Sequence, residues 1–237
     1  MRSQFSQILA VAGTFALCIS ASAQVLEDFE TAPLGNGTMF NSPTFSGSTS
    51  SLLEPSPSVS RVILMPSPRS TIDLNSRQVL EANFEFLWDK SEAWTRLTTF
   101  NTARRPNPFV DINKKLRIQL FVNAPVRLAL GLREVSGTGA IGANGGTSGS
   151  IEWVANSGLN ATGKPGGLLV SAGTWTTVEF DLPSIPRGAS APGQVRNFVG
   201  DGMLNSAGGY TLEHLAISTE SGNWTVQMFI DKFEQVP

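Results

Sequence analysis

The sequence has few of the residues that most often build metal and nucleophile centres. It contains one cysteine, Cys18, and one histidine, His214, in 237 residues. A zinc site would normally need more histidine or cysteine ligands than this chain has. A Ser-His-Asp triad could use His214, but no Gly-x-Ser-x-Gly segment occurs anywhere in the sequence. We therefore interpret His214 as a strand residue with a hydrogen-bond partner.

Charged residues are also scarce. They make up 15% of the chain, and the formal net charge is only −2. A balance this mild gives no reason to expect nucleic acid or a charged membrane surface as a partner. Glycosidases need two carboxyl groups that face each other across a sugar. Glu81 and Glu85 lie four residues apart on one expected strand and point in parallel, so we assign no catalytic residue.

Long apolar runs are absent outside the N-terminus. Arg2 precedes an apolar run at residues 8–19, and Ala21-Ser22-Ala23 follows it as a cleavage signal. The run is too short to span a bilayer, so we expect no membrane span. We predict that residues 1–23 are a signal peptide, and that the mature protein is secreted, periplasmic or in the cell envelope. Cleavage of this signal peptide removes Cys18 and leaves the mature protein with no cysteine for a disulfide.

The clearest structural signal is a pair of alternating runs at 116–122 and 126–133, separated by Asn123-Ala124-Pro125. A period of two places one side of each run in a core and the other side toward water or a ligand. Asn and Pro favour a turn, so the runs predict an antiparallel hairpin. Its polar face would carry Arg117, Gln119, Arg127 and Arg133.

The remaining chain favours many short strands without helices, since 23 glycines and 14 prolines interrupt it. Residues 31–60 are rich in Ser and Pro, and predict irregular coverage of one edge or a flexible linker. Residues 136–150 form a glycine-rich loop, whose Gly-x-Gly-x-x-Gly is not followed by a helix. We predict an all-β fold: one domain over residues 24–237, an antiparallel β-sandwich or jelly roll of about eleven strands.

Two tryptophans have polar neighbours: Trp94 lies near Arg96, and Trp153 follows Glu152. Exposed tryptophan rings stack on sugar C–H surfaces, although half-buried packing gives the same pattern. In the expected hairpin Arg117 would lie opposite Gly131, and Gln119 opposite Ala129, which makes a shallow polar trough. The candidate ligand-binding residues are Trp94, Arg117, Gln119, Arg127, Arg133 and Trp153.

Three segments resemble those of the jelly-roll carbohydrate-binding modules and their galactose-binding-like relatives. They are L-E-D-F-E at 26–30, W-T-T-V-E-F-D-L-P at 175–183, and L-A-I at 215–217 with F-I-D-K-F at 229–233. The resemblance implies a jelly roll whose chain ends meet. It also implies a structural calcium held there by acidic residues, for which Asp28, Glu30 and Asp231 are the matching positions.

These observations predict a secreted, non-catalytic protein that binds a polysaccharide or glycan on one sheet face. One alternative is an enzyme, a jelly-roll polysaccharide lyase or glycoside hydrolase. The missing second histidine and the unpaired carboxylates count against it. A structural envelope or matrix protein is the other alternative.

Overall fold

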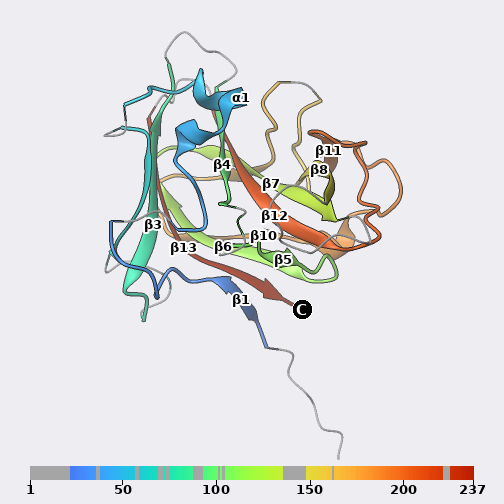
Figure 1. Cartoon of the computed structure of the whole chain (residues 1–237), viewed down its shortest axis with the longest axis horizontal. Helices are drawn as coiled ribbons and strands as arrows, with labels where there is room; N and C mark the ends of the chain where they lie inside the picture. The colour runs from blue at the N-terminus through green and yellow to red at the C-terminus, as the bar shows by residue number, and fades with distance from the viewer. Residues whose placement is uncertain are drawn as a thin grey trace, which may run out of the picture.

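The fold was analysed in a computed structural model, which describes residues 22–35, 38–56, 59–68, 72, 75–87, 93–100, 102, 105–135, 148–161, 163–220 and 225–237. These residues form thirteen strands in two antiparallel sheets that pack face to face (Figure 1). The fold is therefore the antiparallel β-sandwich that the alternating patterns predict. Nearly all of the predicted signal peptide, and residues 136–147 of the glycine-rich loop, lie outside the described residues.

One sheet has six strands. Strand β1 pairs with the last part of β13, which places the two ends of the described chain side by side, as the resemblance implies. A bulge interrupts the pairing of β13 with β6 between Ile230 and Lys232. The order along the sheet is β10 (Thr176–Phe180), β6 (Lys115–Val122), β13 (Thr225–Val236), β3 (Gln78–Glu85) and β2 (Arg61–Pro66), with β1 (Gln24–Glu27) beside β13.

The other sheet has seven strands. Its centre is the long pairing of β7 with β12, which extends from Glu134 opposite Tyr210 to Val126 opposite Thr219. The order is β11 (Val195–Asn197), β8 (Ser148–Val154), β7 (Val126–Val135), β12 (Tyr210–Thr219) and β4 (Trp94–Thr98). Two short strands lie off this path: β5 (Phe109–Val110) pairs with β12, and β9 (Leu168–Val170) pairs with β7.

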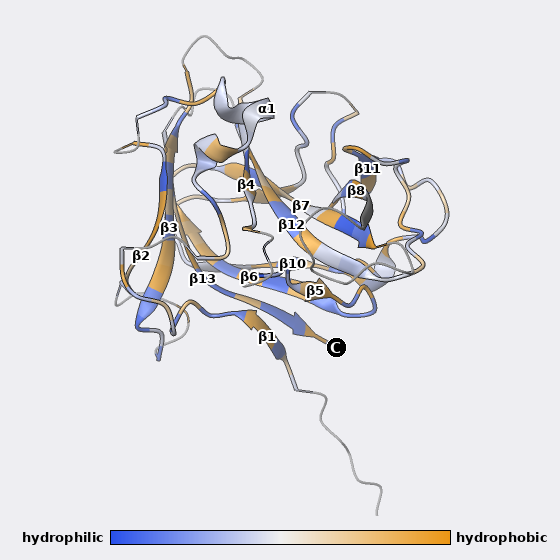
Figure 2. Ribbon diagram, in the orientation of Figure 1, coloured by the Kyte–Doolittle hydropathy of each residue, from blue (hydrophilic) through white to orange (hydrophobic). Residues whose placement is uncertain are grey.

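The core lies between the sheets and is built from the alternating residues. Hydrophobic and hydrophilic residues alternate along the strands (Figure 2). Each fully buried leucine or isoleucine contributes about 1.5–3 kcal/mol relative to an exposed one. The residues predicted to point inward are all buried: Leu116, Ile118, Leu120, Val122, Val126, Leu128, Leu130 and Leu132.

The predicted hairpin is wrong, because β6 and β7 belong to different sheets. Asn123 is tied to β13 instead: its N–H donates to the Gln227 carbonyl at 3.0 Å, and its Oδ1 accepts from the Gln227 N–H at 2.8 Å. The chain then crosses to the opposite sheet. Alternation cannot distinguish the two arrangements, because both bury the same side of each strand.

The Ser- and Pro-rich segment 31–60 packs on the sandwich. Phe40 and Leu53 are buried in the core, where Phe40 bridges to Thr99 and Leu53 to Phe86. The segment forms one short helix, α1 (Gly47–Ser50), and a 3-10 turn, η1 (Pro43–Phe45); a second such turn is η2 (Leu182–Ser184). Within the described part of the chain, no helix is both long and apolar enough to cross a membrane.

Candidate functional site

Three aromatic side chains form a row on the outer face of the six-stranded sheet. Phe121 of β6 and Phe229 of β13 lie opposite each other in the ladder, with ring centroids 6.0 Å apart. Trp175, directly before β10, lies 6.1 Å from Phe121. The chain neighbours of both phenylalanines point into the core, so these rings point outward and are only half-buried. We call Trp175, Phe121 and Phe229 the aromatic row.

Gln119 lies on the same face of β6, between Phe121 and Arg117. It is 8% exposed, and its Oε1 has no hydrogen-bond partner among the residues that the structure describes. The buried Oδ1 of Asn83, on β3 beyond the Phe229 end of the row, also has no hydrogen-bond partner among the described residues. An unsatisfied buried polar atom costs about 1–3 kcal/mol. Each of these two acceptors can take a hydrogen bond from a water molecule or from a hydroxyl group of a ligand.

A cationic cluster flanks the aromatic row next to Gln119. Lys115 Nζ donates to Glu179 Oε1 at 2.7 Å, and Arg117 Nε donates to Glu179 Oε2 at 2.8 Å. The hydrogen bonds from Lys115 and then Arg117 lower the pKa of Glu179, and the same bond raises the pKa of Lys115. Glu179 is therefore held by two cationic side chains at this end of the face.

A second polar cluster lies on β3 and its neighbours. The Glu81 carboxylate accepts from Arg61 at 3.1 Å, from Asn83 Nδ2 at 3.0 Å and from Gln227 Nε2 at 2.9 Å. Glu81 lies directly opposite Phe229 in the ladder. The aromatic row is therefore bordered by polar side chains that hold one another in place, which limits their reorganisation when a ligand binds.

The predicted polar trough does not exist as one surface. Its neighbours differ from the prediction: Arg117 lies opposite Glu179 and Glu234, and Gln119 opposite Thr177 and Lys232. Arg127 and Arg133 belong to β7, on the other sheet. Arg127 Nε donates to Glu220 at 2.6 Å and its Nη1 to the Gly167 carbonyl at 3.1 Å, while Arg133 forms a two-pronged ion pair with Glu213. The four residues thus lie on opposite sides of the core.

Trp153 does not present the exposed ring that its polar neighbours predict. It is 1% exposed, because a second apolar cluster covers it on the outer side of the seven-stranded sheet. Its ring lies 4.8 Å from that of Phe198 and 5.8 Å from that of Trp94, which meets it edge-on. Trp94 itself is half-buried. A sugar could reach the face of Trp153 only if Phe198 moved away.

His214 lies beside Trp153 and is 3% exposed. Its Nδ1 lies 3.1 Å from Thr98 Oγ1, and its Nε2 lies 3.4 Å from Arg96 Nη1. Burial, with smaller effects from Arg96 and Arg133, lowers its pKa to about 3. The ring is therefore neutral, with Nε2 accepting from the guanidinium. This confirms the interpretation of His214 as a strand residue with hydrogen-bond partners.

The three residues matched to a calcium site line one cavity of about 240 Å³. Their oxygen chemistry suits Ca²⁺. The carboxylates are not gathered, however: no group of three or more potential metal-ligating acidic, His or Cys side chains occurs among the described residues. Burial alone would raise the pKa of Glu30, but it is lowered by hydrogen bonds from the Arg77 and Gln78 N–H groups and the Arg77 guanidinium. Calcium at Asp28, Glu30 and Asp231 stays a prediction.

The alternation in the sequence predicts that Arg117 and Gln119 lie on an outer face, but it does not predict the aromatic row beside them. Phe121 alternates with core residues in the same phase as Gln119, so the pattern also predicts its outward direction. The pattern does not predict which side chains lie next to Phe121 in space. Phe229 is more than one hundred residues away, and only the β6–β13 register brings the two rings together.

No protein-family model and no curated protein matches the sequence. Among solved structures, the chain is similar to the family 11 carbohydrate-binding module of a cellulosomal cellulase of Clostridium thermocellum, with 10% identity and a TM-score of 0.41 over 92% of this chain and 95% of that one. The family 11 module in complex with a β-1,3-1,4-mixed-linked tetrasaccharide gives 10% identity and a TM-score of 0.40 over 92% and 96%. An exo-β-agarase gives 12% identity and a TM-score of 0.43 over 90% of this chain but 25% of the agarase.

Proposed function

We propose that this protein binds carbohydrate, with a polysaccharide or glycan lying along the aromatic row of the six-stranded sheet. The observation that carries the proposal is the row of three rings, with neighbouring centroids 6.0 and 6.1 Å apart, on the sheet face that also carries the nearly buried Gln119, whose amide oxygen has no partner among the described residues. Aromatic faces bind the C–H faces of sugar rings, and an amide serves both as donor and as acceptor to hydroxyl groups. A row across three neighbouring segments suits an extended chain better than a single small molecule.

The proposal is binding without catalysis. Glu81 and Glu179, the carboxylates at the two borders of the row, are each held by cationic side chains, and the pKa of Glu179 is lowered. A general acid for glycosidic bonds needs the opposite, a raised pKa and a second carboxyl group across the sugar. The chemistry of this face therefore favours holding a glycan over cleaving it.

The proposal also includes export. Its support is the N-terminal pattern: a basic residue, an apolar run and the Ala21-Ser22-Ala23 cleavage signal. Outside the cytoplasm the protein would meet polysaccharides of an envelope, a matrix or a nutrient source.

The test uses the mature chain, residues 24–237, on a glycan array and on insoluble polysaccharides. We expect binding to at least one extended glycan. Phe121→Ala should weaken it by about 1–2 kcal/mol, through the lost stacking and burial. Phe45→Ala is the matched control, since Phe45 is 62% exposed and lies in η1, away from the row. Failure of the wild-type protein to bind any glycan would contradict the proposal.

A further inference from the structure

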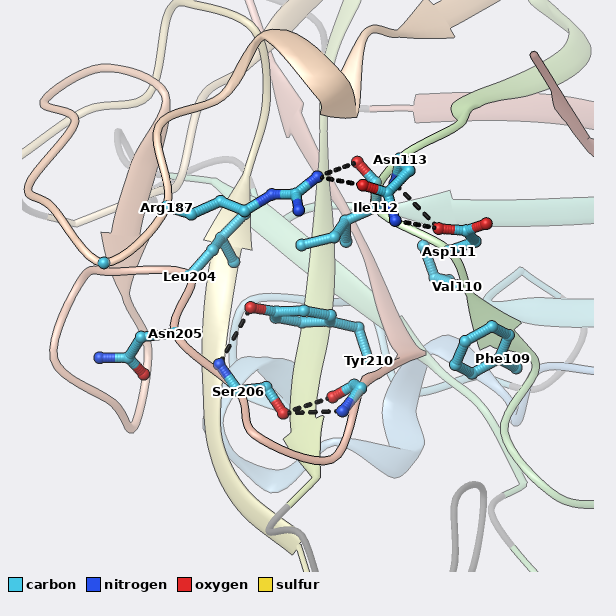
Figure 3. A pocket seen from close by; sticks show the side chains of 12 residues that line it. Phe109, Val110, Asp111, Ile112, Asn113, Arg187, Leu204, Asn205, Ser206 and Tyr210 are labelled. Atoms are coloured by element: carbon cyan, nitrogen blue, oxygen red, sulfur yellow. Dashed lines mark hydrogen bonds between the residues drawn. The ribbon is translucent and has the colours of Figure 1, made fainter.

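A separate cavity of about 480 Å³ lies beside the short strand β5 (Figure 3). This volume falls within the range of roughly 300–1,000 Å³ that small-molecule sites occupy. The cavity is formed by β5 and the turn after it, by Arg187 and Gly188, and by residues 204–210. None of its lining residues belongs to the aromatic row or to its polar borders.

The backbone around this cavity is held by its own hydrogen bonds. The Gly188 N–H donates to the Leu204 carbonyl at 2.9 Å, which joins the two loops. The Ser206 hydroxyl lies 2.7 Å from the Val135 carbonyl oxygen and accepts the Gly209 N–H at 3.1 Å. The walls are therefore pre-formed, and a ligand would pay little ordering entropy on entering.

One wall carries a chain of three polar side chains. Arg187 Nη2 donates to Asn113 Oδ1 at 2.8 Å and to the Ile112 carbonyl at 3.2 Å, and Asn113 Nδ2 donates to Asp111 Oδ1 at 2.9 Å (Figure 3). These bonds fix the guanidinium through one nitrogen only. Within the described residues, no hydrogen bond involves Arg187 Nε, Arg187 Nη1 or Asp111 Oδ2. The Arg187 guanidinium also forms no ion pair with a described carboxylate. Donors and an acceptor are thus offered on the same wall.

Two aromatic rings supply the apolar part. Tyr210 is nearly buried, and its Oη accepts the Ser206 N–H at 3.0 Å, while no described residue accepts its own hydroxyl proton. Phe109 is 44% exposed, so part of its apolar ring faces water and can be covered by a ligand. Phe109 also borders a neighbouring cavity of about 490 Å³, so its ring stands between two hollows.

We propose that this cavity is a second carbohydrate subsite, which takes a single neutral sugar residue such as a chain end. The sugar's C–H face packs on Phe109, and neighbouring hydroxyl groups bond to the Arg187 guanidinium and the Asp111 carboxylate. The pairing of a fixed donor with an acceptor favours hydroxyl groups over an anion, which Asp111 would repel. This inference rests on the proposed function for its ligand class, but not on the aromatic row for its geometry.

The test is a titration of the isotope-labelled mature chain with glucose, galactose, mannose, xylose and N-acetylglucosamine at millimolar concentrations. At least one sugar should shift the amide signals of Asn113 and Ser206, which donate to Asp111 and Tyr210. Phe109→Leu, which keeps an apolar side chain but removes the ring, and Arg187→Gln should each weaken this binding roughly tenfold. Phe45→Ala and Phe121→Ala should leave it unchanged.

The outcomes separate this proposal from the previous one. If no sugar shifts the two amides while a polysaccharide still binds the aromatic row, the pocket proposal is overturned and the proposed function stands. If Phe121→Ala abolishes monosaccharide binding, the sugar lies on the row and the second subsite does not exist. If neither monosaccharides nor polysaccharides bind, both proposals fall.

Discussion

Glu152 makes a specific pH dependence of stability predictable. It lies on β8, is 0% exposed, and accepts the N–H groups of Asp201 at 2.7 Å and Gly202 at 3.0 Å. Burial raises its pKa to about 7, with smaller contributions from Glu134 and Asp201, and the two backbone hydrogen bonds only partly offset this. The loop after β11 is therefore hydrogen-bonded to a carboxyl group whose pKa lies near neutrality.

The direction in which stability changes with pH follows from the number of protons that the folded and unfolded states bind. The pKa of Glu152 is near 4.5 in the unfolded chain and about 7 in the folded one, so the native state binds more protons between these values. Stability from this group is fully present below about pH 4.5 and is lost as the pH rises to 7. At 1.36 kcal/mol per unit, the shift corresponds to about 3 kcal/mol. His214 acts in the opposite direction: its pKa falls from 6.5 to about 3 on folding, so its contribution is lost as the pH falls.

Because the effects of Glu152 and His214 on stability oppose each other between about pH 4.5 and pH 6.5, the quantity to measure is the difference in stability between two proteins. Urea unfolding should be measured at about pH 5 and about pH 8 for the wild type and for Glu152→Gln, which keeps an oxygen acceptor for the loop. Relative to the variant, the wild type should lose roughly 2–3 kcal/mol across this range. Glu54→Gln, in the loop before β2, is the control and should follow the wild type. Equal pH slopes for wild type and Glu152→Gln would refute the reasoning.

The other predictions concern packing, metal and processing. Gly131→Ala would place a Cβ 2.6 Å from the His214 Cβ, and should reduce the free energy of unfolding by about 1–3 kcal/mol in urea titrations; an unchanged midpoint would contradict it. If calcium is bound, EDTA should lower the melting temperature and Asp231→Asn should abolish that difference, whereas identical melts with and without EDTA would remove the calcium prediction. N-terminal sequencing of exported protein should begin at Gln24, and a retained Met1 would refute cleavage.

The fold class was predictable because period-two alternation is a local property. The alternate residues from Leu116 to Val122 and from Val126 to Leu132 are buried as expected, whatever strands they pair with. The pairing partners were not predictable, because β6 lies between β10 and β13, whose residues are distant in the sequence. Residues 123–125 have the composition of a hairpin turn. In the structure, however, Asn123 is hydrogen-bonded to Gln227 of β13, and the chain continues into the other sheet.

The candidate site was predictable in part for the same reason. Gln119 and Arg117 point outward, as their alternation with core residues indicates. Trp153 has polar neighbours in the sequence, but the loop residue Phe198 covers it, and nothing local reveals that contact. Contacts between distant segments also decide the aromatic row, since Phe121 meets Phe229 only through the ladder register.

The most direct test of glycan binding at the aromatic row compares two tryptophans on the same ligand. Trp175 belongs to the row, while Trp94 is equally half-buried on the outer side of the other sheet. The dissociation constant of the best glycan from the array should be measured by titration calorimetry for Trp175→Ala and Trp94→Ala. We predict that Trp175→Ala weakens binding at least about tenfold and that Trp94→Ala leaves it unchanged. Loss of binding in Trp94→Ala alone would place the glycan on the seven-stranded sheet and contradict this assignment.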